Sequence, residues 1–454
     1  MNDANKQTFL VIGLGVSGMS VVRYLDRIGA SFEVVEGNVE RYQTLKQQEA
    51  VLDGVLCHSS ALSFELLSSF DCVVVSPGVS VRTEVFMQAR AAGVEIIGDV
   101  ELFAREVNRS EVNKPVLAVT GSNGKSTVVS MAGELLNAAD INTAVVGNVG
   151  FACLDSLQDE SIEAFVLELS SFQLETTYSL KPTVASVLNI SADHLDRYED
   201  LDDYAEVKRS IYHKAQHVVF NLDDEKTVPT NRSSAGICFS AANQDADWSI
   251  NGDQSKAVLS GGLVAEISAS DVKVAGVHNY VNALAAMAMT SVLIDADKNS
   301  MSEIFTAGFA KFTGLPHRTS LVCESDNVSW INDSKGTNVG AAVSAIKGML
   351  SPVVLIAGGR GKNADYKPLR DVVAELCTAV VLIGEDAEKI ERAIADAVPV
   401  YRAESMQQAV MCAAEISNPG DCVLLSPACA SFDMFNNFEE RGAVFESEVK
   451  KLCA

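Results

Sequence analysis

A lysine and two hydroxyl side chains follow a glycine turn in the segment TGSNGKST, residues 120–127. A common phosphate-binding loop reads G-x-x-x-x-G-K-[ST], and its backbone amides, lysine and hydroxyl bind phosphates and Mg²⁺. Gly124, Lys125 and Ser126 match the end of this pattern, although a valine stands at the position of its first glycine. The segment predicts phosphate binding, with Lys125 on the terminal phosphates and the hydroxyl of Ser126 or Thr127 on Mg²⁺.

Acidic and imidazole side chains follow two later apolar runs. Glu168 ends one run, and Asp193, His194 and Asp196 come directly after the next. A carboxylate at a strand end beside a phosphate loop is well placed to bind a metal. These residues therefore predict a metal site, although without the loop a solvated acid and a surface histidine would be the simpler interpretations.

Gly13, Gly15 and Gly18 form a second glycine pattern, G-x-G-x-x-G, directly after an apolar run. In such a loop the glycines allow a tight turn, the approach of a phosphate and close packing of the following helix, whose N-terminus favours an anion. Glu36 ends the next run, where a ribose hydroxyl would be bound. Taken alone, the pattern indicates an NAD- or FAD-binding domain, and a tight turn without a ligand is the alternative.

Short runs rich in Val, Ile and Leu alternate with helical patterns along most of the chain. Such runs are typical of parallel strands in sheets covered on both faces. They form three groups, separated near 105–115 and near 311–320, and therefore predict an α/β fold with three domains. Two segments differ: 236–276 predicts short antiparallel strands, and the alanine-rich 278–296 predicts a helix packed closely on the central sheet.

The formal net charge of −25 argues against non-specific binding to nucleic acid or to an anionic membrane. No leader pattern or membrane-spanning run is visible, so we expect a cytoplasmic protein. The ten cysteines include no C-x-x-C pair and are expected to be reduced. Cys429 lacks a motif that pairs it with a histidine, and a role as nucleophile is disfavoured. His213 and His217 have a metal-ligand spacing but span the end of a helical pattern, and are interpreted as structural.

Seven segments occur in one order: TGSNGKST, VLELSSFQLE, DHLDRY, HNYVNALAA, FTGLPHR, NDSKGTNVGA and LLSPACASFDMFNNFEERG. Together they resemble the Mur ligase family over nearly the whole chain, and that family has a shortened phosphate loop, T-G-[ST]-N-G-K-[ST]. The resemblance implies three domains: a Rossmann-like UDP-sugar-binding domain at 1–106, a central P-loop ATPase-like domain at 107–314 with a small antiparallel β insertion, and a Rossmann-like amino-acid-binding domain at 315–454.

The segments GLGVSG and LSPACASFD point to the branch of the family that adds D-glutamate to UDP-N-acetylmuramoyl-L-alanine during peptidoglycan synthesis. This resemblance implies an ATP-dependent amide ligase that forms an acyl phosphate and a tetrahedral intermediate and releases ADP and phosphate. It also implies a role in cell-wall growth, cell shape and division. The implied cofactors are ATP, Mg²⁺ at two sites, with Mn²⁺ as an alternative, and a carbamylated Lys208. We expect a monomer that binds these small molecules and neither nucleic acid nor membrane.

Site residues follow from the resemblance position by position. The implied catalytic residues are Lys125, Glu168, His194 and Lys208, and the implied metal ligands are Ser126, Glu168, His194 and Lys208. Contacts to ATP are implied for Gly121, Ser122, Asn123, Gly124, Lys125, Ser126, Thr127, Asn279, Asn282, Arg318, Asp333 and Lys335. Contacts to the two other substrates are implied for Gly13, Gly15, Val16, Ser17, Gly18, Glu36, Gly37, Asn38, Ser76, Pro77, Gly78, Asn148, His317, Thr337, Lys362, Ser431, Phe432 and Phe438. Of these, Thr337, Lys362, Ser431 and Phe438 are assigned to D-glutamate.

Two positions depart from the family pattern. Glu36-Gly37-Asn38 stands where family members often have Asp-Thr-Arg near uracil, so an arginine is missing from that position. Arg360 stands where other members carry an acid, and the sequence does not explain it.

Three alternatives remain open from the sequence. Family members that add L-alanine, diaminopimelate or D-Ala-D-Ala, and the folylpolyglutamate synthetases, share the last two domains, although GLGVSG disfavours the folate enzymes. A nicotinamide-dependent oxidoreductase explains the first glycine loop but neither TGSNGKST nor NDSKGTN. A non-catalytic protein on a ligase scaffold is disfavoured because Lys125, Glu168, His194 and Lys208 are all present.

Overall fold

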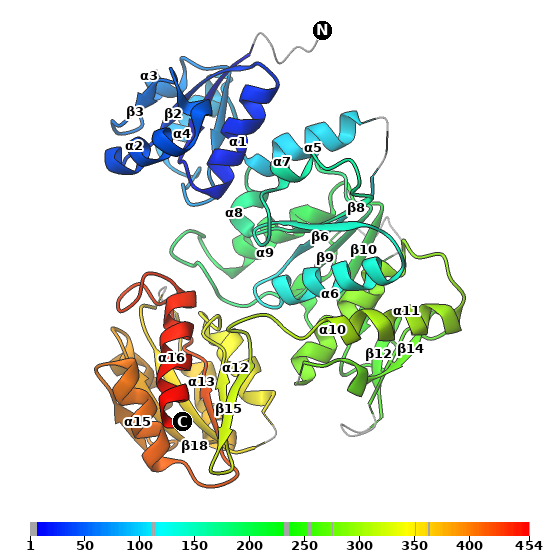
Figure 1. The fold of residues 1–454 in the computed structure, drawn as a ribbon, viewed down its shortest axis with the longest axis vertical. Helices are drawn as coiled ribbons and strands as arrows, with labels where there is room; N and C mark the ends of the chain where they lie inside the picture. Colours follow the sequence, from blue (N-terminus) through cyan, green and yellow to red (C-terminus); the bar gives the residue numbers. More distant parts are fainter. Residues whose placement is uncertain are drawn as a thin grey trace.

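The computed structural model describes residues 7–110, 112, 114–230, 236–252, 257–274, 276–349, 351–361 and 364–453. The described strands form three separate sheets of five, nine and six strands, which follow one another along the chain. The three domains are arranged in chain order, from the blue N-terminal domain through the cyan and green middle domain to the orange and red C-terminal domain (Figure 1). The predicted three-domain α/β fold is confirmed.

The N-terminal sheet has the strand order β3-β2-β1-β4-β5, and its neighbouring strands are parallel. Its strands are β1 (Thr8–Ile12), β2 (Ser31–Val35), β3 (Cys57–His58), β4 (Cys72–Val75) and β5 (Glu95–Ile97). The helices of this part of the chain are α1 (Val16–Arg27), α2 (Val39–Gln48), α3 (Phe64–Leu67), α4 (Glu84–Ala91) and α5 (Asp99–Arg109).

The middle sheet has the strand order β14-β13-β12-β11-β10-β9-β6-β8-β7. Its strands are β6 (Val116–Thr120), β7 (Thr143–Gly147), β8 (Ala164–Glu168), β9 (Val184–Val187), β10 (His217–Asn221), β11 (Gly236–Ser240), β12 (Trp248–Asn251), β13 (Val258–Ser260) and β14 (Glu266–Ser268). Its helices are α6 (Lys125–Ala138), α7 (Cys153–Ser156), α8 (Ser171–Leu174), α9 (Leu201–Arg209), α10 (Val277–Thr290) and α11 (Lys298–Lys311).

The prediction for residues 236–276 is only partly right. β11 pairs in parallel with β10 and with β12, so these strands extend the main sheet, and only β12, β13 and β14 pair in antiparallel fashion. The sequence could not show this, because strand direction depends on the path of the connections rather than on local pattern. The predicted alanine-rich helix is confirmed as α10, whose alanines are fully buried and which packs against α6 and β11.

The C-terminal sheet has the strand order β15-β16-β20-β17-β18-β19. β15 and β16 form an antiparallel hairpin at one edge, and the other neighbouring pairs are parallel. The strands are β15 (Ser320–Ser325), β16 (Val328–Asn332), β17 (Val353–Gly358), β18 (Cys377–Ile383), β19 (Val400–Arg402) and β20 (Cys422–Leu425). The helices are α12 (Val339–Lys347), α13 (Lys367–Leu376), α14 (Ala387–Ile394), α15 (Met406–Ile416) and α16 (Phe438–Leu452).

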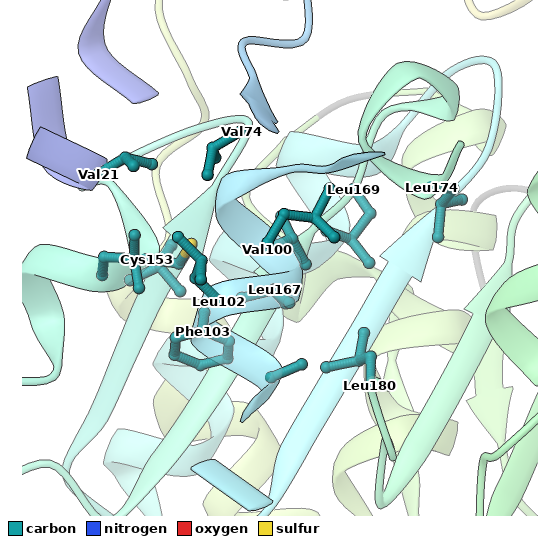
Figure 2. Close-up of a cluster of buried hydrophobic side chains, with 14 of the residues drawn as sticks. Val21, Val74, Val100, Leu102, Phe103, Cys153, Leu167, Leu169, Leu174 and Leu180 are labelled. Atoms are coloured by element: carbon teal, nitrogen blue, oxygen red, sulfur yellow. The ribbon is translucent and has the colours of Figure 1, made fainter. Parts of the chain in front are cut away.

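Helix α5 connects the cores of the N-terminal and middle domains. Val100 and Phe103 of α5 are fully buried and belong to the same apolar cluster as Leu167 of β8 (Figure 2). The rings of Phe103 and Phe165 meet edge to face with their centroids 5.1 Å apart, a favourable aromatic geometry. The predicted domain boundary after residue 106 falls inside this helix, and the boundaries stay predictions.

The cysteines include one pair that the sequence did not predict. Cys323 in β15 and Cys453 after α16 are joined by a disulfide, so the expectation that all ten are reduced is wrong for this pair. These two residues are 130 positions apart in the chain, and only the packing of α16 beside β15 brings them together. Among the described helices, none is long and apolar enough to span a lipid bilayer.

Candidate active site

The loop between β6 and α6 forms the centre of the site. β6 is fully buried, and α6 begins at Lys125 with Gly124 as its N-cap at a left-handed φ of 81°. A Cβ on Gly124 would lie 2.4 Å from Asn282 Oδ1, so both the backbone conformation and the space require glycine. The loop thereby presents the N-terminus of α6, an anion-binding feature, beside α10. Asn282 is buried and its Nδ2 donates to Asn279 Oδ1 at 3.3 Å.

Ser126, Glu168 and Asn148 form a hydrogen-bonded group after three neighbouring strands, β6, β8 and β7. Ser126 Oγ donates to Glu168 Oε2 at 2.5 Å, and Asn148 Nδ2 donates to Glu168 Oε1 at 2.8 Å. Glu168 has an exposed fraction of 2%. Both oxygens of this buried carboxylate therefore meet a donor, and the adjacent hydroxyl and carboxylate oxygens are of the type that Mg²⁺ prefers.

Lys208 of α9 packs against the same loop and has an exposed fraction of 1%. Its Nζ donates to Gly121 O at 2.9 Å. Burial lowers the pKa of Lys208 well below its usual value, Lys125 lowers it further, and Asp193 and Glu168 partly oppose this. A buried lysine of this kind favours the neutral amine, which is nucleophilic.

His194 follows β9 in a turn and has a left-handed φ of 55°. Its Nε2 lies 3.6 Å from Asp193 Oδ2, and its ring meets the ring of Phe172 edge to face at 4.7 Å. Asp196, by contrast, is exposed. In the described part of the chain, no group of three or more His, Cys, Asp and Glu side chains could hold a metal ion. His213 and His217 are both exposed.

Cations from the C-terminal domain reach the phosphate loop. Arg318 Nη2 donates to Ser126 Oγ at 2.6 Å, across the domain boundary. Burial and the nearby charges of Arg318 and Lys125 together lower the pKa of Lys335 to about 8, although Glu168 partly opposes them. Burial also lowers the pKa of Arg318. Arg318 and Lys335 thus lie near the buried carboxylate of Glu168, with Lys125 close to Lys335, and this group of cations suits a ligand with several negative charges.

Asp333 lies directly after β16, in the same domain. It has an exposed fraction of 8%, accepts a hydrogen bond of 2.7 Å from Ser426 Oγ and accepts another of 3.2 Å from the backbone N–H of Thr319. Burial raises the pKa of Asp333 to about 6. The structure therefore places this predicted ATP contact next to the segment that carries Arg318.

Two asparagines connect the phosphate loop to the start of α12. Asn123 Nδ2 donates to Asn338 Oδ1 at 3.3 Å, and Asn338 Nδ2 donates to Asn123 Oδ1 at 3.0 Å and to Asp193 Oδ2 at 3.2 Å. A small cleft at this junction is lined by Asp193, Thr337 and Asn338, together with Leu195 and alanines. Of the remaining predicted loop residues, Ser122 Oγ accepts from the N–H of Ser191, and Thr127 is buried in α6.

The first glycine loop lies between β1 and α1. Gly13 has a φ of 83°, and a Cβ on Gly18 would lie 1.8 Å from Gly13 O, so neither position tolerates a side chain. Gly15 caps α1, and Val16 and Ser17 follow it, with Val16 75% exposed. The predicted residues Ser76, Pro77 and Gly78 follow β4, and Ser76 Oγ donates to Gly13 O at 2.8 Å. The structure therefore brings the two predicted substrate-binding segments together.

Glu36 and Arg41 flank this loop. The Glu36 carboxylate accepts hydrogen bonds from the backbone N–H groups of Leu14, at 3.2 Å, and Asn38, at 3.0 Å. Gly37 lies between Glu36 and Asn38, and Asn38 caps α2. Arg41, one turn further, donates from Nη2 to Leu14 O at 3.1 Å. Sequence reasoning missed Arg41, although its place three residues after a capping asparagine could have indicated that it lies near the loop.

The predicted substrate contacts of the C-terminal domain lie at different depths. Ser431 has an exposed fraction of 2% and Phe432 one of 66%. Phe438 begins α16, and its ring centroid lies 3.8 Å from Lys335 Nζ. His317 belongs to the same domain, and its ring Nδ1 lies 2.8 Å from Asn332 Nδ2 and 3.3 Å from Glu446 Oε1. Lys362 lies outside the described residues.

Cys429 and Arg360 are both explained by their surroundings. Cys429 has an exposed fraction of 1%, its Sγ lies 3.1 Å from Tyr366 Oη, and burial raises the pKa of its thiol to about 12. Such a thiol is inert, because the thiolate is the reactive form. Arg360 Nε donates to Glu385 Oε2 at 2.9 Å in an exposed ion pair, which accounts for a basic residue at this position.

Comparisons with known proteins agree along the whole chain. Three family models match: the MurD-like N-terminal domain of Mur ligases at residues 7–98, the Mur ligase middle domain at 119–290 and the glutamate ligase domain of Mur ligases at 317–429. Proteins named UDP-N-acetylmuramoylalanine–D-glutamate ligase are similar: that of Legionella pneumophila strain Philadelphia 1 is 44% identical, covering 99% of this chain and 100% of the relative, and that of Pseudomonas aeruginosa strain PAO1 is 44% identical, covering 98% of each.

A solved structure shows the same fold at much lower identity. The UDP-N-acetylmuramate–alanine ligase of Thermotoga maritima superposes with a TM-score of 0.60 at 19% identity, covering 98% of this chain and 100% of that one. Full-length relatives at 44% identity establish common descent. The chain therefore belongs to the Mur ligase family.

Proposed function

We propose that the protein joins D-glutamate to UDP-N-acetylmuramoyl-L-alanine and converts ATP to ADP and phosphate. The curated relatives with 44% identity and full coverage are named for this reaction, which supports the choice of substrates. The structural observation that carries the proposal is the convergence of Lys125, Arg318 and Lys335 at the start of α6. Three partly buried cations and a helix N-terminus suit a nucleoside triphosphate, although the whole chain is strongly acidic.

The phosphate loop supplies the contacts to ATP in this proposal. Lys125 Nζ donates to the backbone oxygens of Gly121, at 2.8 Å, and Ser122, at 2.9 Å. Phosphate oxygens would be stronger acceptors for this ammonium group than neutral carbonyls. Asn279 and Asn282, at the start of α10, would contact the adenine, and Asp333 would face the nucleotide from the C-terminal domain.

The oxygen atoms of Ser126 and Glu168 fit a divalent cation. Ser126 Oγ and Glu168 Oε2 lie 2.5 Å apart, and the other carboxylate oxygen, Oε1, accepts a hydrogen bond from Asn148 Nδ2. Mg²⁺ or Mn²⁺ would neutralise phosphate charge during phosphoryl transfer. We assign a second ion to His194 and to a carbamylated Lys208.

Carbamylation of Lys208 is supported by its burial and its lowered pKa. The neutral amine adds to CO₂, a C–N bond forms, a proton leaves, and the side chain becomes a carboxylate-like anion. Nuclear magnetic resonance with carbon-13-labelled bicarbonate should show a carbamate signal that disappears in Lys208→Arg. A wild-type protein without such a signal, under conditions of full activity, would contradict the assignment.

The chemistry has two steps, and the protein mainly binds and orients the reactants. An oxygen of the alanyl carboxylate attacks the γ-phosphorus, the bond to ADP breaks, and an acyl phosphate forms. The amine of D-glutamate then attacks the acyl carbon, a proton is lost, and the tetrahedral intermediate releases phosphate as the amide forms. Thr337, Ser431 and Phe438, together with Lys362, would bind D-glutamate beside the phosphate loop.

The N-terminal domain would hold the UDP-sugar. The Gly13–Gly18 loop and the 76–78 segment lie together, and the N-terminus of α1 suits a diphosphate. Arg41 supplies a cation beside this loop, where position 38 lacks one. We expect the reaction to take place in the cytoplasm and the protein to act as a monomer, which light scattering of the purified protein would test.

Phosphate release tests the proposal directly. The protein is incubated with ATP, Mg²⁺ and UDP-N-acetylmuramoyl-L-alanine, and D-glutamate is compared with L-glutamate, L-alanine, diaminopimelate and D-Ala-D-Ala. Release that requires the nucleotide-sugar and D-glutamate supports the proposal. Turnover with another acceptor would reassign the chain within the family. NAD binding without phosphate release would favour the oxidoreductase, and ATP binding without turnover would favour a non-catalytic protein.

A further inference from the structure

We infer that Arg197 is a positioning residue for the nucleotide-sugar. It fixes the 76–79 turn of the N-terminal domain against the part of the middle domain that contains His194, the proposed metal ligand. The inference rests on the proposed function, because that function assigns residues 76–78 to the UDP-sugar. Arg197 belongs to the DHLDRY segment, three residues after His194, but neither the sequence nor the family comparison assigned it a role.

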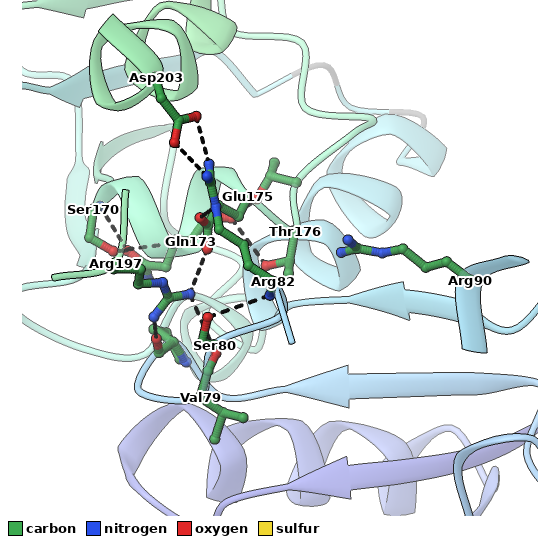
Figure 3. Close-up of polar contacts among 12 residues, drawn as sticks. Val79, Ser80, Arg82, Arg90, Ser170, Gln173, Glu175, Thr176, Arg197 and Asp203 are labelled. Atoms are coloured by element: carbon green, nitrogen blue, oxygen red, sulfur yellow. Dashed lines mark hydrogen bonds and ion pairs between the residues drawn. The ribbon is translucent and has the colours of Figure 1, made fainter. Parts of the chain in front are cut away.

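The guanidinium of Arg197 crosses from the middle to the N-terminal domain. Nη1 donates to Pro77 O at 3.0 Å, and Nη2 donates to Val79 O at 3.4 Å (Figure 3). Nη2 also donates to Glu175 Oε2 at 2.5 Å. The side chains of Arg197 and Glu175 are 10% and 5% exposed. The largely buried guanidinium of Arg197 therefore donates to the backbone oxygens on both sides of Gly78.

A second arginine, Arg82, lies in the N-terminal domain and donates hydrogen bonds to carboxylates of the middle domain. Arg82 Nε donates to Glu175 Oε1 at 2.6 Å, and its Nη1 and Nη2 donate to Asp203 at 2.5 and 3.0 Å (Figure 3). Asp203 lies in α9, the helix that carries Lys208. Two arginines and two carboxylates form a cluster of balanced charge at the domain junction, in which Arg197 and Glu175 are the least exposed members.

Contacts continue from this cluster to both proposed binding sites. Arg197 Cζ lies 3.9 Å from the ring centroid of Phe172, and that ring packs against His194 at 4.7 Å. On the other side, the turn gripped by Arg197 contains Ser76, whose hydroxyl donates to Gly13 O. One chain of packed and hydrogen-bonded residues therefore runs from the histidine assigned to a metal to the glycine loop assigned to the diphosphate.

The planar guanidinium is needed because it binds three acceptors that point at it from two domains. A lysine ammonium is a compact charge and cannot reproduce this fork geometry. Loss of the fork would release the turn and weaken binding of the nucleotide-sugar. Binding of ADP should not change, because Arg197 is not among its proposed contacts, which lie in the phosphate loop, α6, α10 and the C-terminal domain.

The test compares Arg197→Ala and Arg197→Lys with a matched control, Arg23→Ala. Arg23 of α1 also pairs across the same two domains, with Asp155 of α7 at 2.6 Å, but its other partner is Glu49 and not the 76–79 turn. Calorimetric titration measures the Kd of UDP-N-acetylmuramoyl-L-alanine and of ADP for each full-length protein. Steady-state kinetics give KM for each substrate and kcat, and thermal unfolding checks the fold.

We expect Arg197→Ala to weaken nucleotide-sugar binding at least about tenfold, as loss of hydrogen bonds from a charged donor predicts. Arg197→Lys should fall between it and the wild type, which keeps the test open if the alanine variant unfolds. The Kd of ADP and the KM of ATP should stay within about twofold. Unchanged nucleotide-sugar binding in both variants, or equal weakening in Arg23→Ala, would overturn this inference but not the proposed function. Wild-type protein that binds ADP but no nucleotide-sugar would overturn the proposed function and this inference with it.

Discussion

Replacement of Gly124 by alanine tests whether the geometry of the phosphate loop is as tight as the structure indicates. Gly124 has a φ of 81°, and an added Cβ would lie 2.4 Å from Asn282 Oδ1, far inside contact distance. The amide of Asn282 would therefore have to move, and it would lose its 3.3 Å hydrogen bond to Asn279. The variant combines a backbone strain with a steric clash, and the two effects can be separated.

The expected loss of stability follows from these two effects. A left-handed backbone conformation costs a non-glycine residue about 1–2 kcal/mol. Displacement of Asn282 and loss of its buried hydrogen bond cost about 1 kcal/mol more. The total is about 2–3 kcal/mol, which for a domain of about 200 residues lowers Tm by roughly 5–10 °C.

Thermal unfolding without nucleotide measures this loss, and Gly29→Ala is the matched control. Gly29 also has a left-handed φ, of 68°, but nothing lies within 4 Å of an added Cβ, so this variant reports the backbone effect alone. Asn282→Ala removes the clashing atom, and in the double variant Gly124→Ala should cost about 1 kcal/mol less than in the wild-type background. If Gly124→Ala costs no more than Gly29→Ala, or if the two substitutions are simply additive, the clash does not exist and the reasoning is wrong.

Four further outcomes are expected. Glu168→Gln should lower phosphate release by about 100-fold or more while the protein stays folded, because a buried charged partner of the phosphate site is lost; turnover near the wild-type rate would exclude the metal assignment. Asp333 has a folded pKa of about 6 against a usual value of 3.8, so the folded state binds its proton more tightly, and stability should fall as pH rises from about 4 to about 6, by up to about 3 kcal/mol. Thermal unfolding of Asp333→Asn should lack this part of the pH dependence, and an identical profile would contradict the raised pKa. Arg41→Ala should raise KM for the nucleotide-sugar about fivefold, the value of one exposed hydrogen-bonded contact, and leave KM for ATP unchanged; equal changes in both would point to a general structural effect. Cys429→Ala should keep at least about half of the turnover, and iodoacetamide should not label Cys429 in the native protein, whereas rapid labelling would show that the thiol is accessible.

Much of the fold could be predicted from local sequence. The runs at 116–120, 164–168 and 353–358 are continuous apolar stretches, and each is a fully buried parallel strand in the structure. The phosphate loop was visible because its residues are neighbours in the chain, and the local pattern places Lys125 and Ser126 at the start of α6. The direction of β11 and β12 was not visible, since parallel and antiparallel strands share the same local pattern.

The candidate site shows the same division. Glu168 and His194 were found because each ends or follows an apolar run in a recognisable motif. Arg41 and Arg197 were not found, since their partners are backbone oxygens that belong to other segments. The Cys323–Cys453 disulfide was missed because its two cysteines are 130 positions apart in the chain.

The amino-acid sequence by itself determined the secondary elements, the two glycine loops and membership of a family, because periodicity, turn residues and short motifs are properties of neighbouring residues. The tertiary structure alone decided which charged and polar side chains contact one another. Arg82 and Asp203 are 121 residues apart, and Arg318 and Ser126 are 192 apart, yet each pair is in contact. Such contacts form only when whole domains pack together, since the two partners belong to different domains and no local pattern brings them close. The grouping of cations around the phosphate loop and the arginine contact with the 76–79 turn are consequences of that packing.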